Sequence, residues 1–148
     1  MRITNVVAIV VSLCAASLVG CGSATEPTLR QLAWIGYQPN QAIVAPDTAR
    51  VGQPFDVTVT TWGSGSRACN DPDGTTVAYL GSVARVTAFV RVPRGDVTCT
   101  RDLRSYPQRA VVRLQSPGVT VIRLIGAKSS RSRPVVVDSV ERVVVVVP

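Results

Sequence analysis

The chain has 148 residues, of which 46% are hydrophobic and 17% are charged, and its 16 Lys and Arg outnumber its 9 Asp and Glu. This length suits one domain with one hydrophobic core. The sequence contains no histidine, which excludes imidazole as a catalytic base or as a metal ligand.

The first twenty residues have the pattern of an export signal. Arg2 supplies a positive charge, and Val6 to Val19 is an apolar run of 14 residues. A run of that length is shorter than the roughly 20 residues that span a bilayer, and it fits the apolar region of a secretory signal peptide.

The end of this run, Leu18-Val19-Gly20-Cys21, resembles the lipobox of bacterial lipoproteins. The resemblance implies a signal peptide over residues 1–20, cleavage after Gly20, and a diacylglycerol on the Cys21 thiol. Two or more acyl chains would anchor the chain firmly, because each buried methylene contributes about 0.8 kcal/mol. The alternative is an ordinary signal peptide that leaves Cys21 as a free thiol.

Location follows from the same resemblance. Residues 21–28 then form the lipidated cysteine and a flexible tether, which is small and polar in composition and spans roughly 15 Å. We therefore expect a lipid-anchored protein of the cell envelope that stays close to its membrane. Gly22 and Ser23 follow the cysteine, which in an envelope with two membranes implies the outer one.

Cys69 and Cys99 are the cysteines left over in the folded part, because Cys14 leaves with the signal peptide and Cys21 carries the lipid. An even pair in an oxidising compartment predicts a disulfide. Closing its 29-residue loop contributes about 3.5–4 kcal/mol of stability. A metal pair or a redox pair is the alternative, but the sequence has no CxxC spacing and no further thiol for such a site.

Short β-patterned segments separated by turn residues follow the tether. Apolar residues repeat every two positions and not at the helical period of 3.6. In Phe55–Trp62, for example, Val57 and Val59 share the face that we expect to point inward. The same alternation predicts two further inward sets, which are Ala84, Val86, Ala88, Val90 and Val92, and Ala110, Val112 and Leu114. Leu29–Gln38 is either a first strand or a partly irregular lead-in. The other expected strands are Thr75–Leu80, Val83–Val92, Arg109–Gln115, Val119–Ile125 and Val135–Val147. Loops are expected over Gly63–Gly74 and Pro93–Pro107, and turns at Pro46–Thr48, Val51–Pro54 and Ser116–Gly118.

About seven short strands predict an all-β fold, an antiparallel sandwich over residues 29–148. The stretches Pro46–Gly63 and Ser116–Leu124, with the terminal valine strand, resemble bacterial immunoglobulin-like (Ig-like) domains. The resemblance implies an Ig-like sandwich. It departs from antibody domains, because both cysteines fall in loop-like segments and no tryptophan lies between them.

The terminal run Val143–Val147 has two interpretations. The first is a strand in the interior of a sheet, paired on both sides. The second is an exposed apolar edge that recruits a strand from a partner.

The sequence contains few residues that could form a catalytic or metal-binding site. Asp71 and Asp73 are the only close pair of carboxylates, in the turn-like segment Asn70–Gly74. This segment resembles part of a calcium loop, but the glutamate that completes such a loop is missing, and Asx turns explain the segment without a metal. We predict no enzyme activity, no metal and no cofactor.

Arginines on the outward side of the expected strands are the remaining feature. If the strands share a sheet they form one basic face, and if the chain crosses between sheets the charges divide over two. Arginine suits phosphate and carboxylate groups, so lipopolysaccharide, acidic glycans and lipid phosphates are candidate ligands. Nucleic acid is disfavoured because stacking aromatics are missing. The alternative is an ordinary soluble surface. The candidate anion-binding residues are Arg85, Arg91, Arg109, Arg113 and Arg123.

These observations predict a non-catalytic envelope lipoprotein whose Ig-like domain makes protein–protein or surface contacts, for example as an accessory subunit of an assembly. A polyanion-binding module that uses the arginines is the second hypothesis.

Overall fold

A computed structural model of the chain describes residues 28–95, 97–129 and 136–148. The predicted signal peptide, the lipobox with Cys21, and tether residues 22–27 lie outside the described residues, so these predictions are untested by the fold.

The described chain is all-β, which confirms the predicted fold class. It has nine strands where the sequence predicted about seven, because β2 and β3 contain only two and three residues and carry too little pattern to predict. The elements are β1 (Thr28–Leu32), a single 3-10 turn η1 (Pro39–Gln41), β2 (Ile43–Val44), β3 (Thr48–Arg50), β4 (Pro54–Ser64), β5 (Asp71–Leu80), β6 (Val83–Pro93), β7 (Leu103–Arg113), β8 (Gly118–Ala127) and β9 (Val137–Val147).

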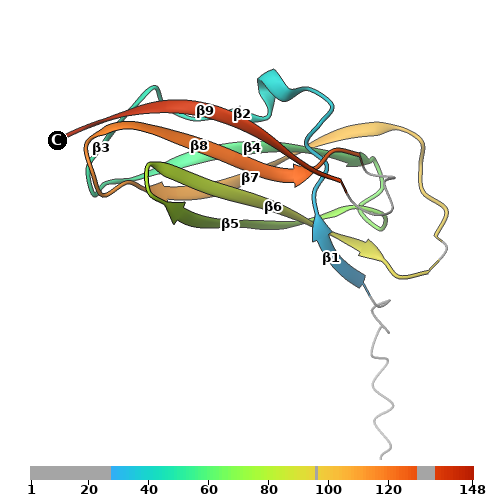
Figure 1. Cartoon of the computed structure of the whole chain (residues 1–148). Helices are drawn as coiled ribbons and strands as arrows, with labels where there is room; N and C mark the ends of the chain where they lie inside the picture. Colours follow the sequence, from blue (N-terminus) through green and yellow to red (C-terminus); the bar gives the residue numbers. More distant parts are fainter. Residues whose placement is uncertain (1–27, 96, 130–135) are drawn as a thin grey trace, which may run out of the picture.

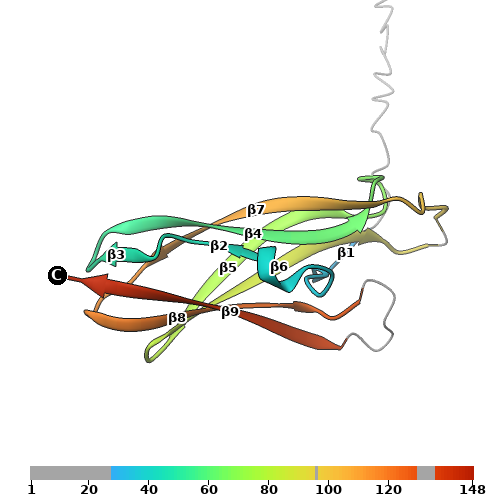
Figure 2. The same cartoon turned by 90° about the horizontal axis from the view of Figure 1, so that it is seen from above.

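Two sheets lie against each other (Figures 1 and 2). The large sheet has the strand order β1-β6-β8-β9-β3, with β5 on the other edge of β6. The small sheet has the order β2-β4-β7. Most neighbours are antiparallel, but β6 pairs with β8 and β3 pairs with β9 in parallel.

The core lies between the sheets, on the side that the period-two pattern predicted. Val57 and Val59 of β4 are fully buried, and so is Leu124 of β8. Burial of apolar surface contributes about 25 cal/mol per Å² and is the main force that holds the sheets together. The other members from the predicted inward sets are Ala84, Val86, Ala88, Val90, Ala110, Val112 and Leu114.

The long sides of the sandwich are joined by different means. On one side, Trp34 bridges the sheets, since its backbone pairs with Trp62 of β4 and with Ala127 of β8. On the other side, Thr75 of β5 donates a side-chain hydrogen bond to the Arg109 carbonyl of β7 over 2.9 Å. These contacts occupy edges that would otherwise present unpaired backbone groups.

Two predicted loops are shorter than expected. β5 begins at Asp71, inside the predicted Gly63–Gly74 loop, and the register shifts between Pro72 and Thr75. β7 begins at Leu103, inside the predicted Pro93–Pro107 loop. Proline and glycine suggested loops in both places, but a bulge accommodates them in β5, and β7 is the edge strand of its sheet, where a missing N–H is tolerated.

The ends of the sandwich differ. At one end, which we call the disulfide end, lie the start of β1 and the connections Gly65–Asn70 and Arg94–Asp102. The opposite end, which we call the turn end, carries the C-terminus and the connections Val51–Gln53, Gly81–Ser82 and Leu114–Pro117 (Figures 1 and 2).

Candidate functional site

The disulfide joins two connections at the disulfide end. Cys69 and Cys99 are bonded, with their Cα atoms 5.8 Å apart, which confirms the predicted pairing. Cys69 is buried and Cys99 is exposed. Because both cysteines lie outside the strands, as predicted, the bond closes one end of the sandwich and does not cross its core.

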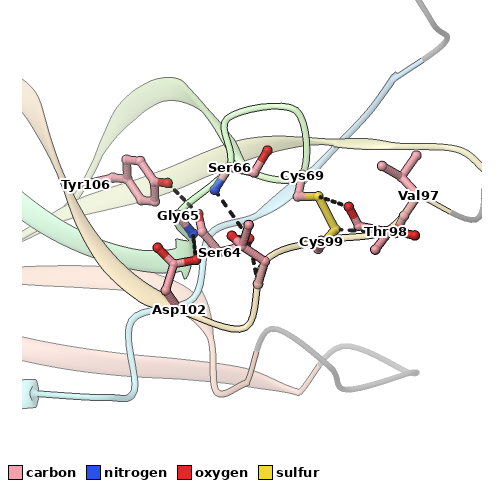
Figure 3. Close-up of a disulfide and its surroundings, with 10 residues drawn as sticks. Ser64, Gly65, Ser66, Cys69, Val97, Thr98, Cys99, Asp102 and Tyr106 are labelled. Carbon is pink, nitrogen blue, oxygen red and sulfur yellow. Dashed lines mark hydrogen bonds between the residues drawn. A yellow bond between two sulfur atoms is a disulfide. The ribbon is translucent and has the colours of Figure 1, made fainter.

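Hydrogen bonds around the disulfide tie the same connections together (Figure 3). The Ser64 hydroxyl lies 2.9 Å from the Thr100 carbonyl oxygen. The Gly65 N–H donates to the Asp102 carbonyl, and Tyr106 donates its phenol proton to the Ser64 carbonyl. Bonds to the ionised carboxylate, from the Thr100 hydroxyl first and from Arg104 and the Gly65 N–H as well, hold the pKa of Asp102 below its ordinary value.

The five candidate arginines do not form one basic face. Arg85 and Arg91 of β6 and Arg123 of β8 lie on the large sheet, whereas Arg109 and Arg113 lie on β7 of the small sheet. The chain crosses between the sheets at the Arg94–Asp102 connection and again after β7, so the charges divide, which is the second of the two arrangements considered from the sequence.

Carboxylates neutralise three of these arginines. Arg91 lies 2.7 Å from Asp73, and Arg109 lies 2.6 Å from Asp56. Arg123 pairs with a carboxylate of β9 over 2.6 Å, across the strand pair in register. In the described part of the chain, Arg85 and Arg113 have no recorded ion pair, and they lie on different sheets. Arg85 and Arg123 are direct cross-strand partners, but Arg123 is already paired with a carboxylate, and the five arginines do not gather at one place.

Asp73 is a structural ion-pair partner. Arg30 of β1 approaches its carboxylate to 2.6 Å, and Arg91 of β6 approaches it to 2.7 Å. Arg30 also stacks over the Phe89 ring, with its guanidinium carbon 3.6 Å from the ring centroid. The side chain of Asp73 thus links three strands, while Asp71 is exposed at the start of β5. Among residues 28–95, 97–129 and 136–148, no cluster of His, Cys, Asp and Glu could hold a metal ion.

An aromatic cluster that the sequence did not predict lies where Trp34 joins the two sheets. The Tyr37 ring lies 5.9 Å from Trp34 and 4.8 Å from Trp62, measured between ring centroids. Trp34 donates its indole N–H to the Lys128 carbonyl over 2.8 Å. Trp34 and Tyr37 are close in the sequence, but Trp62 is distant from both, so only the pairing of Trp34 with β4 could have revealed the cluster.

Valine side chains gather on the outer surface of the large sheet. Val83, Val121 and Val143 are consecutive cross-strand partners on β6, β8 and β9, and Val119 pairs with Val145 beside them. We call these five residues the valine face. Val119 is 65% exposed and Val143 is 55% exposed.

The terminal strand β9 is paired on both sides over only part of its length. β8 pairs with β9 along its whole length. On the other edge, β3 pairs only with Val145–Val147, so in the described chain the backbone from Val137 to Val144 has no strand partner on that side. Arg142 is paired with Asp47 near this edge. A charge at an edge of this kind discourages indiscriminate pairing.

No protein family, curated protein or solved structure matches the chain. Within the described ranges, no helix is long and apolar enough to cross a membrane.

Proposed function

We propose that this chain is a non-catalytic envelope lipoprotein, anchored through Cys21, whose β-sandwich binds a partner protein with the valine face. The observation that carries the proposal is the exposed apolar surface that the valine face makes on the large sheet. Single exposed valines are common on protein surfaces, but contiguous apolar patches mark interaction sites.

The strand pairing makes the valine face a continuous apolar surface. Its members come from three neighbouring strands in register, so their side chains stand side by side on one face of the sheet. β-branched side chains have little rotamer freedom to lose, which lowers the entropic cost of ordering them in an interface. A partner that presents an apolar, uncharged surface fits this chemistry.

The position of the valine face supports the same proposal. Val119 and Val145 lie close to the turn end, since β8 starts at Gly118 and β9 ends at Val147. The start of β1 lies at the opposite end (Figure 1). A lipid on Cys21 would therefore hold the membrane at the end of the sandwich opposite Val119 and Val145, where a partner can reach these residues.

A pair of substitutions tests the valine face in the full-length protein produced in its own host. In V119E/V143E, two carboxylates would have to be desolvated in the interface, which costs several kcal/mol unless they are paired. We expect the wild-type protein, extracted in mild detergent, to form a stoichiometric complex of defined mass, and we expect V119E/V143E to be recovered without its partner.

The matched control is V44E/V111E, which places the same charges at valines of the small sheet that are 62% and 51% exposed. This control should keep the complex. Recovery of wild-type monomer alone, or of a complex that contains only this chain, would contradict the proposal, and so would equal losses in the two variants.

Mass spectrometry of the same preparation tests the anchor independently. We expect a chain that begins at Cys21 and carries acyl groups on that residue. An intact leader, or a processed chain without acyl groups, would remove the lipoprotein part of the proposal and leave the valine face to be judged by the substitutions.

A further inference from the structure

We propose that the disulfide end is an electrostatic docking surface for the anionic lipid headgroups of the membrane that anchors the chain. The inference rests on the proposed function for its orientation, because it takes Cys21 as the site of the lipid. It adds a second, non-covalent contact with the bilayer and assigns that contact to particular basic residues.

Four exposed basic residues lie in the connections at the disulfide end. Arg67 follows β4, Arg94 and Arg101 lie between β6 and β7, and Lys128 follows β8. Within residues 28–95, 97–129 and 136–148 none of the four forms an ion pair, whereas the Asp102 carboxylate beside them is already bonded to Arg104 over 3.1 Å. These four cations are therefore available to an external anion, unlike Arg91, Arg109 and Arg123 on the sheets.

The turn end provides an internal contrast. Its connections are Val51–Gln53, Gly81–Ser82 and Leu114–Pro117, and their sequences contain no charged residue. The basic connections are thus confined to one end of the sandwich, although basic and acidic residues occur on the strands throughout.

The tether that leads to the lipid on Cys21 would join the sandwich at this basic end. Thr28, the first residue of β1, pairs with Pro93, and Arg94 is the next residue after that partner. Six residues, 22–27, lie between Cys21 and Thr28, the first residue of β1. The seven residue steps from Cys21 to Thr28 reach at most about 24 Å when the chain is fully extended. The disulfide end is consequently the part of the sandwich that a bilayer holding the Cys21 lipid meets first.

Fixed contacts hold the basic connections on one surface. The Cys69–Cys99 bond links the connection that contains Arg67 to the connection that contains Arg94 and Arg101. The bond from the Trp34 indole to the Lys128 carbonyl fixes the start of the third connection. The cations therefore approach a membrane together.

Electrostatics at a membrane surface favours this contact. An anionic leaflet attracts basic residues that come within about 8 Å of it, the Debye length at physiological ionic strength. Guanidinium groups also bind phosphate bidentately. The tether keeps the distance short, so the attraction adds to the lipid anchor.

The test uses the sandwich without its acyl chains, as residues 22–148 secreted from an ordinary cleavable leader. All the strand pairs, the disulfide and the buried core described above lie within residues 28–148. Sedimentation with vesicles of phosphatidylcholine, with and without phosphatidylglycerol, measures binding. We expect binding only when phosphatidylglycerol is present, and we expect added salt to abolish it.

The decisive variant is R94Q/R101Q, and its matched control is R85Q/R113Q, which removes the same charge from two strand arginines that form no ion pair with the described residues. Each cation at an anionic surface is expected to change affinity about fivefold. We therefore expect R94Q/R101Q to weaken vesicle binding roughly 25-fold, and we expect the control to weaken it far less. All four side chains are exposed, and near-ultraviolet circular dichroism would confirm that both variants keep their fold.

Three results would overturn the inference: no binding to phosphatidylglycerol vesicles, equal losses in the two variants, or binding to soluble polyanions without binding to vesicles. None of these would affect the acyl group on Cys21 or the complex made by the valine face, because the probe lacks the lipid and the partner. A failure of this inference is thus distinguishable from a failure of the proposed function.

Discussion

The two ends of the sandwich are held together by different kinds of interaction. At the turn end, short connections change direction through local backbone conformation, with Gly81 at φ +58° between β5 and β6. At the disulfide end, longer connections are held by a covalent bond and by hydrogen bonds such as that from Ser64 to Thr100. The turn end therefore depends on the residues of each turn, and the disulfide end depends on contacts between segments that are distant in the sequence.

This contrast also separates the two proposed roles. The end that is pinned together carries the exposed basic connections and the start of β1, and the end with tight uncharged turns lies beside the valine face. A cross-linked, basic end suits contact with a bilayer surface, and a contiguous apolar surface near the far end suits contact with a protein. Three changes test whether the ends differ in stability as this view requires.

The largest effect is expected from C69S/C99S, which removes the covalent closure of the disulfide end. The unfolded chain gains the entropy of a 29-residue loop, so the free energy of unfolding should fall by about 3.5–4 kcal/mol. Urea denaturation monitored by tryptophan fluorescence measures this loss. A loss below about 1 kcal/mol would show that hydrogen bonds alone close this end, and the contrast between the ends would disappear.

An intermediate effect is expected from G81A at the turn end. Alanine at a positive φ brings its Cβ close to backbone atoms, so the free energy of unfolding should fall by about 1–2 kcal/mol. The Cβ would meet no other heavy atom within 4 Å, so the cost comes from backbone strain and not from a clash. S82A, the neighbouring substitution at a residue without a positive φ, is the control and should leave stability almost unchanged. Equal effects of G81A and S82A would show that the local conformation of this turn does not matter.

The smallest effect is a dependence on pH at the disulfide end. The bond from Thr100, with those from Arg104 and Gly65, lowers the pKa of Asp102 in the folded state. The carboxylate therefore stabilises the fold above the ordinary aspartate pKa of about 3.9, and this contribution is lost as the pH falls through the folded-state pKa. The gap in melting temperature between wild type and D102N should be larger at neutral pH than at the lowest pH of an acid titration. A gap that stayed constant across the titration would remove this contribution.

Much of the fold could be predicted from the sequence because period-two alternation fixes which side of a strand is buried. The inward sets that contain Val57, Ala88 and Val112 are buried as expected. The start of β7 could not be predicted, because Pro107 disfavours a central strand, and only its position at the edge of a sheet allows it there. β3 was missed because three residues carry no readable period, and its pairing with β9 is a tertiary contact.

The candidate site was predicted less well than the fold. Alternation correctly placed Arg85, Arg109 and Arg123 on the outside, but it could not tell which sheet each strand would join. It also could not reveal that Glu141 would stand directly opposite Arg123, or that Asp56 would lie diagonally across from Arg109 and pair with it. Cross-strand partners depend on register between distant segments, which single-strand patterns do not contain.

The sequence by itself determined the all-β class, the inward and outward sides of the main strands, and the pairing of Cys69 with Cys99, because each of these follows from nearest-neighbour alternation or from simple counting. Only the tertiary structure decided how the strands divide into two sheets, and with that division the splitting of the arginines, the making of the valine face and the gathering of basic connections at one end. The physical reason is that a strand satisfies its backbone hydrogen bonds only with a partner, and the choice of partner is made by packing between segments far apart in the chain.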